Sequence, residues 1–106
     1  MARVLLSVPK RARPGEVVEI KALIAHPMET GYRPGPNGRI LPRDIVERVA
    51  CTYGGEVVFA AELSPAVSAN PYLVFTTVAR DSGPITLTWT GDNGFRQSET
   101  AVIEVA

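Results

Sequence analysis

Apolar and polar residues alternate in several short segments of this chain. Residues 17–24 are an example, because every second residue from Val18 onward is apolar, while Glu19 and Lys21 lie on the opposite side. An alternation with a period of two is typical of a β-strand that buries one face. Comparable patterns predict further strands over residues 4–8, 46–53, 56–63, 72–80, 85–90 and 100–105.

Turn residues separate these segments. Residues 54–55 (Gly-Gly) and 92–94 (Asp-Asn-Gly) are typical of hairpin turns. Seven short strands with regular turn signals predict an all-β fold, an immunoglobulin-like antiparallel β-sandwich of about seven strands. At 106 residues the chain has the length of one domain, so we expect a single domain over residues 1–106.

Two of the predicted strands carry large apolar residues on both faces. In the strand over 72–78, Tyr72 and Val74 lie opposite the apolar residues at positions 73 and 75. A hairpin register that pairs residues 53 and 56 places Phe59 on the outer face of its strand. The strand over 85–90, by contrast, has a polar face of threonines. A two-layer sandwich covers only one face of each sheet, so the surplus predicts an exposed apolar patch, the usual mark of a protein interface.

The alternative is that a long loop over residues 27–44 folds back over this patch. The segment contains four prolines and three glycines, which removes too many backbone donors for a β-ladder. Loops of this length in a compact domain are usually functional or disordered. Two loop segments have an unusual composition: 26–31 (His-Pro-Met-Glu-Thr-Gly) and 65–72 (Pro-Ala-Val-Ser-Ala-Asn-Pro-Tyr). Within the second, Asn70 is either a loop stabiliser or part of the rim of a docking surface.

Charge and cysteine content exclude several classes of protein. Eleven basic residues balance eleven acidic ones, so we expect neither nucleic acid nor a membrane surface as a partner. The single cysteine excludes an internal disulfide and multi-cysteine metal sites. The apolar run at the start is too short for a secretory signal, and no apolar run reaches the length of a membrane span.

The sequence offers little that predicts catalysis. Cys51 lies in mid-strand among apolar neighbours, where a thiol behaves as a small hydrophobe. A blue-copper site needs two imidazoles, and His26 is the only histidine. Ser68 and His26 could contribute to a triad, but no nucleophile-elbow pattern accompanies them. We therefore expect no catalytic, cofactor-binding or metal-binding residues. The alternative is a stand-alone sandwich that binds a small ligand, or a hydrolase that uses His26.

Several segments together resemble the SoxZ family of the bacterial sulfur-oxidation (Sox) system. The likeness runs over nearly the whole length, and the two loop segments described above are its most specific part. The segments that carry it are residues 15–21, 26–31, 51–54, 65–72 and 92–94, with Phe59 and Trp89.

The resemblance implies a non-catalytic subunit that forms a heterodimer with a SoxY-like carrier protein. Such a carrier holds the sulfur intermediates of thiosulfate oxidation on a cysteine in a flexible C-terminal arm. This sequence ends without a Gly-rich tail or a terminal cysteine, so we expect it to be the partner of the carrier. Members of the family usually lack a signal of their own, which implies a periplasmic protein exported with its partner.

The expected partner-binding residues follow from the apolar surplus and the loop segments. Transient contact with other Sox enzymes, and a homodimer of isolated chains, are further expectations. Met28 and Tyr32 are expected either at the surface that binds the carrier or at a surface where Sox enzymes dock. The full set is Phe59, Tyr72, Val74, Asn70, Met28 and Tyr32.

Overall fold

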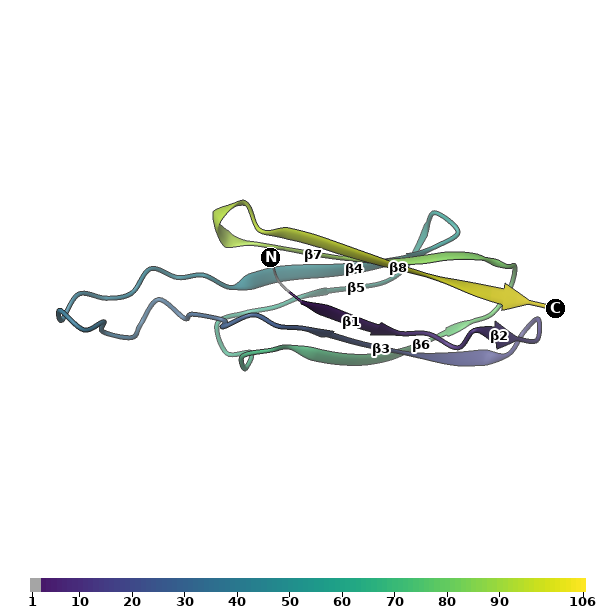
Figure 1. Ribbon diagram of the computed structural model, residues 1–106, viewed down its shortest axis with the longest axis horizontal. Helices are drawn as coiled ribbons and strands as arrows, with labels where there is room; N and C mark the ends of the chain where they lie inside the picture. The colour runs from purple at the N-terminus through teal and green to yellow at the C-terminus, as the bar shows by residue number, and fades with distance from the viewer. Residues whose placement is uncertain (1–2) are drawn as a thin grey trace.

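The computed structural model describes residues 3–106, in which eight strands form two packed sheets (Figure 1). The smaller sheet is antiparallel and has the strand order β1-β3-β6. The prediction of an all-β antiparallel sandwich is confirmed. The strands of the smaller sheet are β1 (Val4–Ser7), β3 (Val17–Ile24) and β6 (Tyr72–Val78).

The larger sheet has the strand order β2-β8-β7-β4-β5. All its pairings are antiparallel except the short one between β2 and β8. A 3-10 turn, η1 (Asp92–Gly94), connects β7 to β8. The strands are β2 (Arg11–Ala12), β4 (Val46–Tyr53), β5 (Glu56–Glu62), β7 (Gly83–Gly91) and β8 (Arg96–Val105).

The core lies between the sheets and is built from the alternate residues that the pattern predicted. Ile20 and Ile24 on β3 and Leu87 and Trp89 on β7 are fully buried. Tyr53 closes one end of the core, because its hydroxyl donates to the Asp81 carbonyl (2.6 Å) and accepts from the Arg80 N–H (3.1 Å). No helix within residues 3–106 is long and apolar enough to cross a membrane.

A β-bulge changes the register of the β4–β5 hairpin. Tyr53 pairs with Glu56 as predicted, but the register shifts by one residue between Cys51 and Thr52, so that Cys51 lies opposite Phe59. One extra residue in a strand turns every following side chain to the other face. The predicted outward position of Phe59 is therefore wrong, and Phe59 shares the inner face with Cys51.

Residues 27–44 form an arm that projects along the long axis of the molecule, away from both sheets (Figure 1). The molecule measures 58 × 20 × 18 Å, and the arm forms one end of its long axis. Isolated bridges join Glu29 to Asp44 and Pro34 to Ile40, so the two halves of the arm run antiparallel. The prediction of a long loop is confirmed, and this loop does not fold back over a sheet.

Candidate partner-binding surface

The outer face of the three-stranded sheet carries a set of apolar side chains that we call the exposed face. Two rows across the strands form its ends. In the first row, Leu5, Leu23 and Tyr72 lie side by side, and in the second, Val17 lies beside Val78. Tyr72 is 56% exposed, Val74 50% and Val17 64%. The exposed face consists of Leu5, Val17, Leu23, Tyr72, Val74 and Val78.

A narrow polar band separates the two apolar rows. Glu19 and Lys21 form an ion pair there, with 3.5 Å between Lys21 Nζ and Glu19 Oε1. Both side chains are about half exposed, so water screens the pair and it contributes little to stability. A shallow groove beside Lys21 is lined chiefly by Leu5, Leu23 and Tyr72. The surface is therefore mainly apolar with one neutralised charge pair, a composition suited to a protein partner.

The outer face of the larger sheet has a different character. Thr86 and Thr100 bond across β7 and β8 at 3.0 Å, and Thr88 and Ser98 do the same at 3.0 Å. Threonine and serine ladders of this kind suit a sheet surface that faces water. Exposed apolar residues occur there singly, as at Val102. The apolar surplus is thus concentrated on one sheet, as the sequence predicted for Tyr72 and Val74.

Phe59 contributes to the core rather than to the exposed face. Its ring stacks on Phe75 of β6, with 4.2 Å between the ring centroids and 7° between the ring planes. The side chain is half-buried and packs against the main core. Phe59 consequently joins the two sheets at the side where β5 and β6 have their free edges.

Met28 and Tyr32 lie in different environments. Met28 is only 4% exposed, and its Sδ accepts a hydrogen bond from the Val46 N–H (3.3 Å). The expectation that Met28 lies at a docking surface is therefore wrong. The side chain is buried and fixes the base of the arm to β4. Tyr32 is 79% exposed on the arm, which separates it from Tyr72 and Val74 on the sheet.

Asn70 fixes the loop that leads into β6. Its Oδ1 accepts from the His26 N–H (3.0 Å), and its own N–H donates to the His26 carbonyl (2.8 Å). The backbone at Asn70 has φ 54°, a left-handed conformation that asparagine adopts more readily than most residues. These contacts are those of a loop stabiliser, next to the start of the strand that carries Tyr72.

His26 and Cys51 carry the side chains best suited to catalysis or metal binding, and both are buried. The His26 Nδ1 accepts the Met28 N–H (3.0 Å), so the proton resides on Nε2, which lies 3.8 Å from Asp44 Oδ1. No hydroxyl or thiol of residues 3–106 bonds to this imidazole. Burial raises the pKa of the Cys51 thiol to about 11, which keeps it protonated. Within the same part of the chain, no three His, Cys, Asp or Glu side chains form a group that could hold a metal.

The base of the arm is fixed to the β7–β8 turn by charge. Arg43 donates two hydrogen bonds to the Asp92 carboxylate (2.8 and 2.7 Å), and Asp92 also accepts the Ile45 N–H (3.1 Å). The hydrogen bond from Arg43 is the main reason that the pKa of Asp92 falls to about 2. Bidentate arginine–carboxylate pairs hold a specific geometry, so the arm has a defined attachment to the sandwich.

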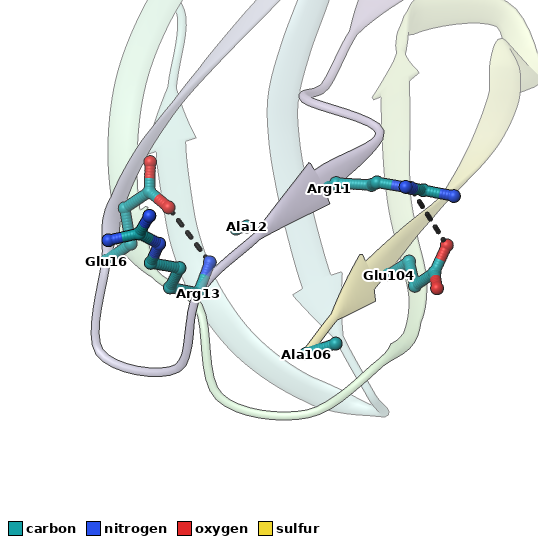
Figure 2. Close-up of a pocket in the computed structure, with 6 residues that line it drawn as sticks. All are labelled: Arg11, Ala12, Arg13, Glu16, Glu104 and Ala106. Atoms are coloured by element: carbon teal, nitrogen blue, oxygen red, sulfur yellow. Dashed lines mark hydrogen bonds and ion pairs between the residues drawn. The ribbon is translucent and has the colours of Figure 1, made fainter.

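Figure 2 shows a hollow at the opposite end of the molecule, between β2 and β8. Two of its charged side chains pair with each other, since Arg11 Nε lies 3.3 Å from Glu104 Oε2, and Glu16 Oε1 accepts the backbone N–H of Arg13 (2.9 Å). The side chains of Arg11 and Glu104 are largely exposed, so water weakens their interaction with any ligand. This hollow has the character of ordinary surface.

Four residues of the exposed face were not among the expected partner-binding residues. Leu5, Val17, Leu23 and Val78 complete the face that Tyr72 and Val74 begin. A signal for Val17 and Leu23 was present in the sequence, because both are apolar on the side of their strand that also carries Glu19 and Lys21. The sequence alone could not show that these strands are neighbours in the order β1-β3-β6.

These features define a class of protein: an immunoglobulin-like sandwich with a buried thiol, a buried imidazole and one exposed apolar sheet face. Residues 6–102 match the family model described as "Sulphur oxidation protein SoxZ". The chain therefore belongs to the SoxZ family. No curated protein sequence matches this chain.

Solved structures with the same fold include superoxide reductases and a sulfur carrier protein. A superoxide reductase (neelaredoxin) from Ignicoccus hospitalis is 12% identical, with a TM-score of 0.76 over 97% of this chain and 80% of that one. The sulfur carrier protein SoxY from Chlorobium limicola f. thiosulfatophilum is 9% identical, with a TM-score of 0.68 over 97% and 78%. A putative superoxide reductase from Thermotoga maritima is 14% identical, with a TM-score of 0.73 over 97% and 85%. Likeness at this level of identity shows the fold alone.

Proposed function

We propose that this chain is the non-catalytic subunit of a heterodimer with a SoxY-like carrier, which holds sulfur intermediates on a cysteine during thiosulfate oxidation. The family membership supports a role in the Sox system. The state of Cys51 carries the assignment of the subunit. A carrier cysteine must be accessible and must form a thiolate, whereas Cys51 is fully buried and its pKa is raised to about 11.

The exposed face is the surface proposed for the carrier. Tyr72 lies beside Leu23 and Val74 beside Lys21 on this face, and apolar patches of this kind mark protein interfaces. Asn70 supports this surface by fixing the loop before Tyr72, and Phe59 supports it from within by packing under β6. Met28 acts through the arm and has no direct contact with the carrier.

The test is the affinity of the purified chain for its carrier, measured by calorimetry. Aspartate at position 72 or 74 places a charge in the proposed interface, and Val102→Asp is the matched control on the other sheet. We expect Tyr72→Asp and Val74→Asp to weaken binding at least 30-fold, the loss of about 2 kcal/mol typical of an interface hot spot. Unchanged affinity of both variants, in chains that remain folded, would place the interface elsewhere.

The arm is proposed as the contact with Sox enzymes that act on the carrier. Tyr32 and Ile40 are exposed on it, and its bidentate anchor holds it at a defined angle to the sandwich. Tyr32→Ser should leave the heterodimer intact and lower the rate of thiosulfate-dependent turnover in the reconstituted system. A normal rate would remove Tyr32 from the enzyme contact. The proposed location of the complex is the periplasm, which cell fractionation with an antibody to this chain tests directly.

A further inference from the structure

The four strand edges of the two sheets differ in how they are protected. An open edge pairs readily with another chain unless it is short, charged or bulged. The edge strands β1 and β2 have only four and two residues. The edge strand β5 has a bulge in its pairing and a glutamate at each end, Glu56 and Glu62. Strand β6 has seven residues and contains no charge, no proline and no bulge. It is the unprotected edge among residues 3–106.

The hydrogen bonds at its two ends fix the direction of the β6 backbone groups. Ile24 N–H donates to the Pro71 carbonyl (3.1 Å), and Ala79 N–H donates to the Glu16 carbonyl (2.8 Å). Both bonds join β3 to odd-numbered residues of this segment, and alternate residues of an antiparallel strand bond on opposite sides. The N–H and C=O groups of Tyr72, Val74, Thr76 and Val78 therefore point away from β3, where no strand of residues 3–106 pairs with them.

The same four residues also face outward with their side chains. Tyr72, Val74 and Val78 belong to the exposed face, and Thr76 lies between them. A strand placed against β6 would thus extend the three-stranded sheet and would continue the exposed face sideways. Backbone bonds would supply affinity, and alternate side chains would supply specificity, as in other cases of strand addition.

The open edge of β6 adjoins the exposed face directly, because Tyr72, Val74 and Val78 lie on this strand. A stable partner interface covers about 800 Å² on each side. A partner that covers the exposed face therefore also reaches the outward N–H and C=O groups of β6. The SoxY structure from Chlorobium limicola has the same fold, so a SoxY-like partner has strands of its own to offer.

We propose that the carrier adds one of its strands to the open edge of β6 and continues the β1-β3-β6 sheet across the heterodimer. This inference rests on the proposed function, which supplies the partner, and adds the mode of contact. The occupant is an extended segment of about seven residues, the length that pairs with β6.

Amide hydrogen exchange by NMR tests the proposal in the unmodified proteins. The chain is labelled with 15N and measured alone and with the unlabelled carrier. We expect the amides of residues 72, 74, 76 and 78 to exchange fast in the free chain and at least 100-fold more slowly in the complex. The amides of residues 73, 75 and 77 should be slow in both. A complex that leaves the even-numbered amides fast would overturn strand addition while the proposed function stands.

Two further outcomes separate the proposal from its alternatives. If no complex with the carrier forms, the proposed function itself fails. If the even-numbered amides become protected in the chain alone as its concentration rises, the occupant is a second copy, which overturns the assignment to the carrier.

A pair of variants tests the backbone bond directly. Thr76→Pro removes an outward N–H and leaves the bonds to β3 in place, whereas Thr76→Val keeps the N–H and a similar shape. We expect Thr76→Pro to weaken binding to the carrier at least 10-fold and Thr76→Val by less than 3-fold, with folding checked by Trp89 fluorescence. Equal affinity of two folded variants would rule out a bond at this position.

Discussion

Replacement of Phe59 by alanine tests whether its side chain lies on the inner face of β5, as in the structure, or on the outer face, as the sequence predicted. In the structure the ring is half-buried and stacks on Phe75. Full burial of a phenylalanine makes the change to alanine cost about 3–5 kcal/mol, so a half-buried ring should cost about 2 kcal/mol. The stacked pair adds about 1 kcal/mol. We therefore expect Phe59→Ala to lower the free energy of unfolding by about 2–3 kcal/mol, a large share of the stability of a small domain.

Urea unfolding followed by fluorescence measures this change, because Trp89 is the only tryptophan and is fully buried. Val57→Ala is the matched control on the same strand: Val57 is 60% exposed, so its loss should change the free energy of unfolding by no more than about 0.5 kcal/mol. A double-mutant cycle with Phe75→Ala should give a coupling energy of about 1 kcal/mol. A cost below about 0.5 kcal/mol for Phe59→Ala would refute the inner position and restore the outward one.

Three other measurements test the remaining parts of the structure. Cys51 should react with iodoacetamide at pH 8 at least about 100-fold more slowly in the folded chain than in urea, because its raised pKa leaves little thiolate; rapid labelling of the native chain would contradict its burial. Tyr53→Phe should lower the free energy of unfolding by about 1–3 kcal/mol in a urea titration, since Asp81 and Arg80 each lose a hydrogen-bond partner; a neutral effect would mean that water replaces the hydroxyl. The pKa of Asp92 is lowered from 3.8 to about 2, so its contribution to stability is complete above about pH 5 and is lost as the pH falls through 2. Asp92→Asn should flatten the acid limb of the stability curve in that window, and an unchanged limb would show that the pair with Arg43 does not form in solution.

The sequence predicted the strands and their buried faces wherever the outcome depends on local alternation. Val18 and Ile20 on β3 are buried as the period of two requires, and Tyr72 and Val74 on β6 face outward for the same reason. Each of these strands pairs in one uninterrupted register with its neighbour. Where a strand has no bulge, the alternation of apolar and polar residues along it is enough to predict which side chains reach the core.

The register of β5 could not be predicted in the same way. The bulge next to Phe59 depends on where the paired strands accommodate one extra residue, which the alternation of a single strand does not show. The bulged register lets Phe59 stack on Phe75 across the sandwich. The path of the arm has a similar origin, because the bond between Arg43 and Asp92 joins residues 49 positions apart. Met28 was misplaced for this reason: its segment looked like an exposed loop, while a contact with Val46 buries the side chain.

The structural neighbours show why side chains rather than architecture have to carry the functional argument. Superoxide reductases and a sulfur carrier share this sandwich at TM-scores of 0.68 to 0.76 with only 9–14% identity, so the fold is compatible with different kinds of protein. In this chain the lone histidine is engaged by the Met28 N–H and the lone cysteine is kept protonated within the core. The groups left open to other molecules include apolar side chains on one sheet face and backbone groups along its edge. Groups of these two kinds suit another polypeptide, because protein partners bind by buried area and by ladder bonds.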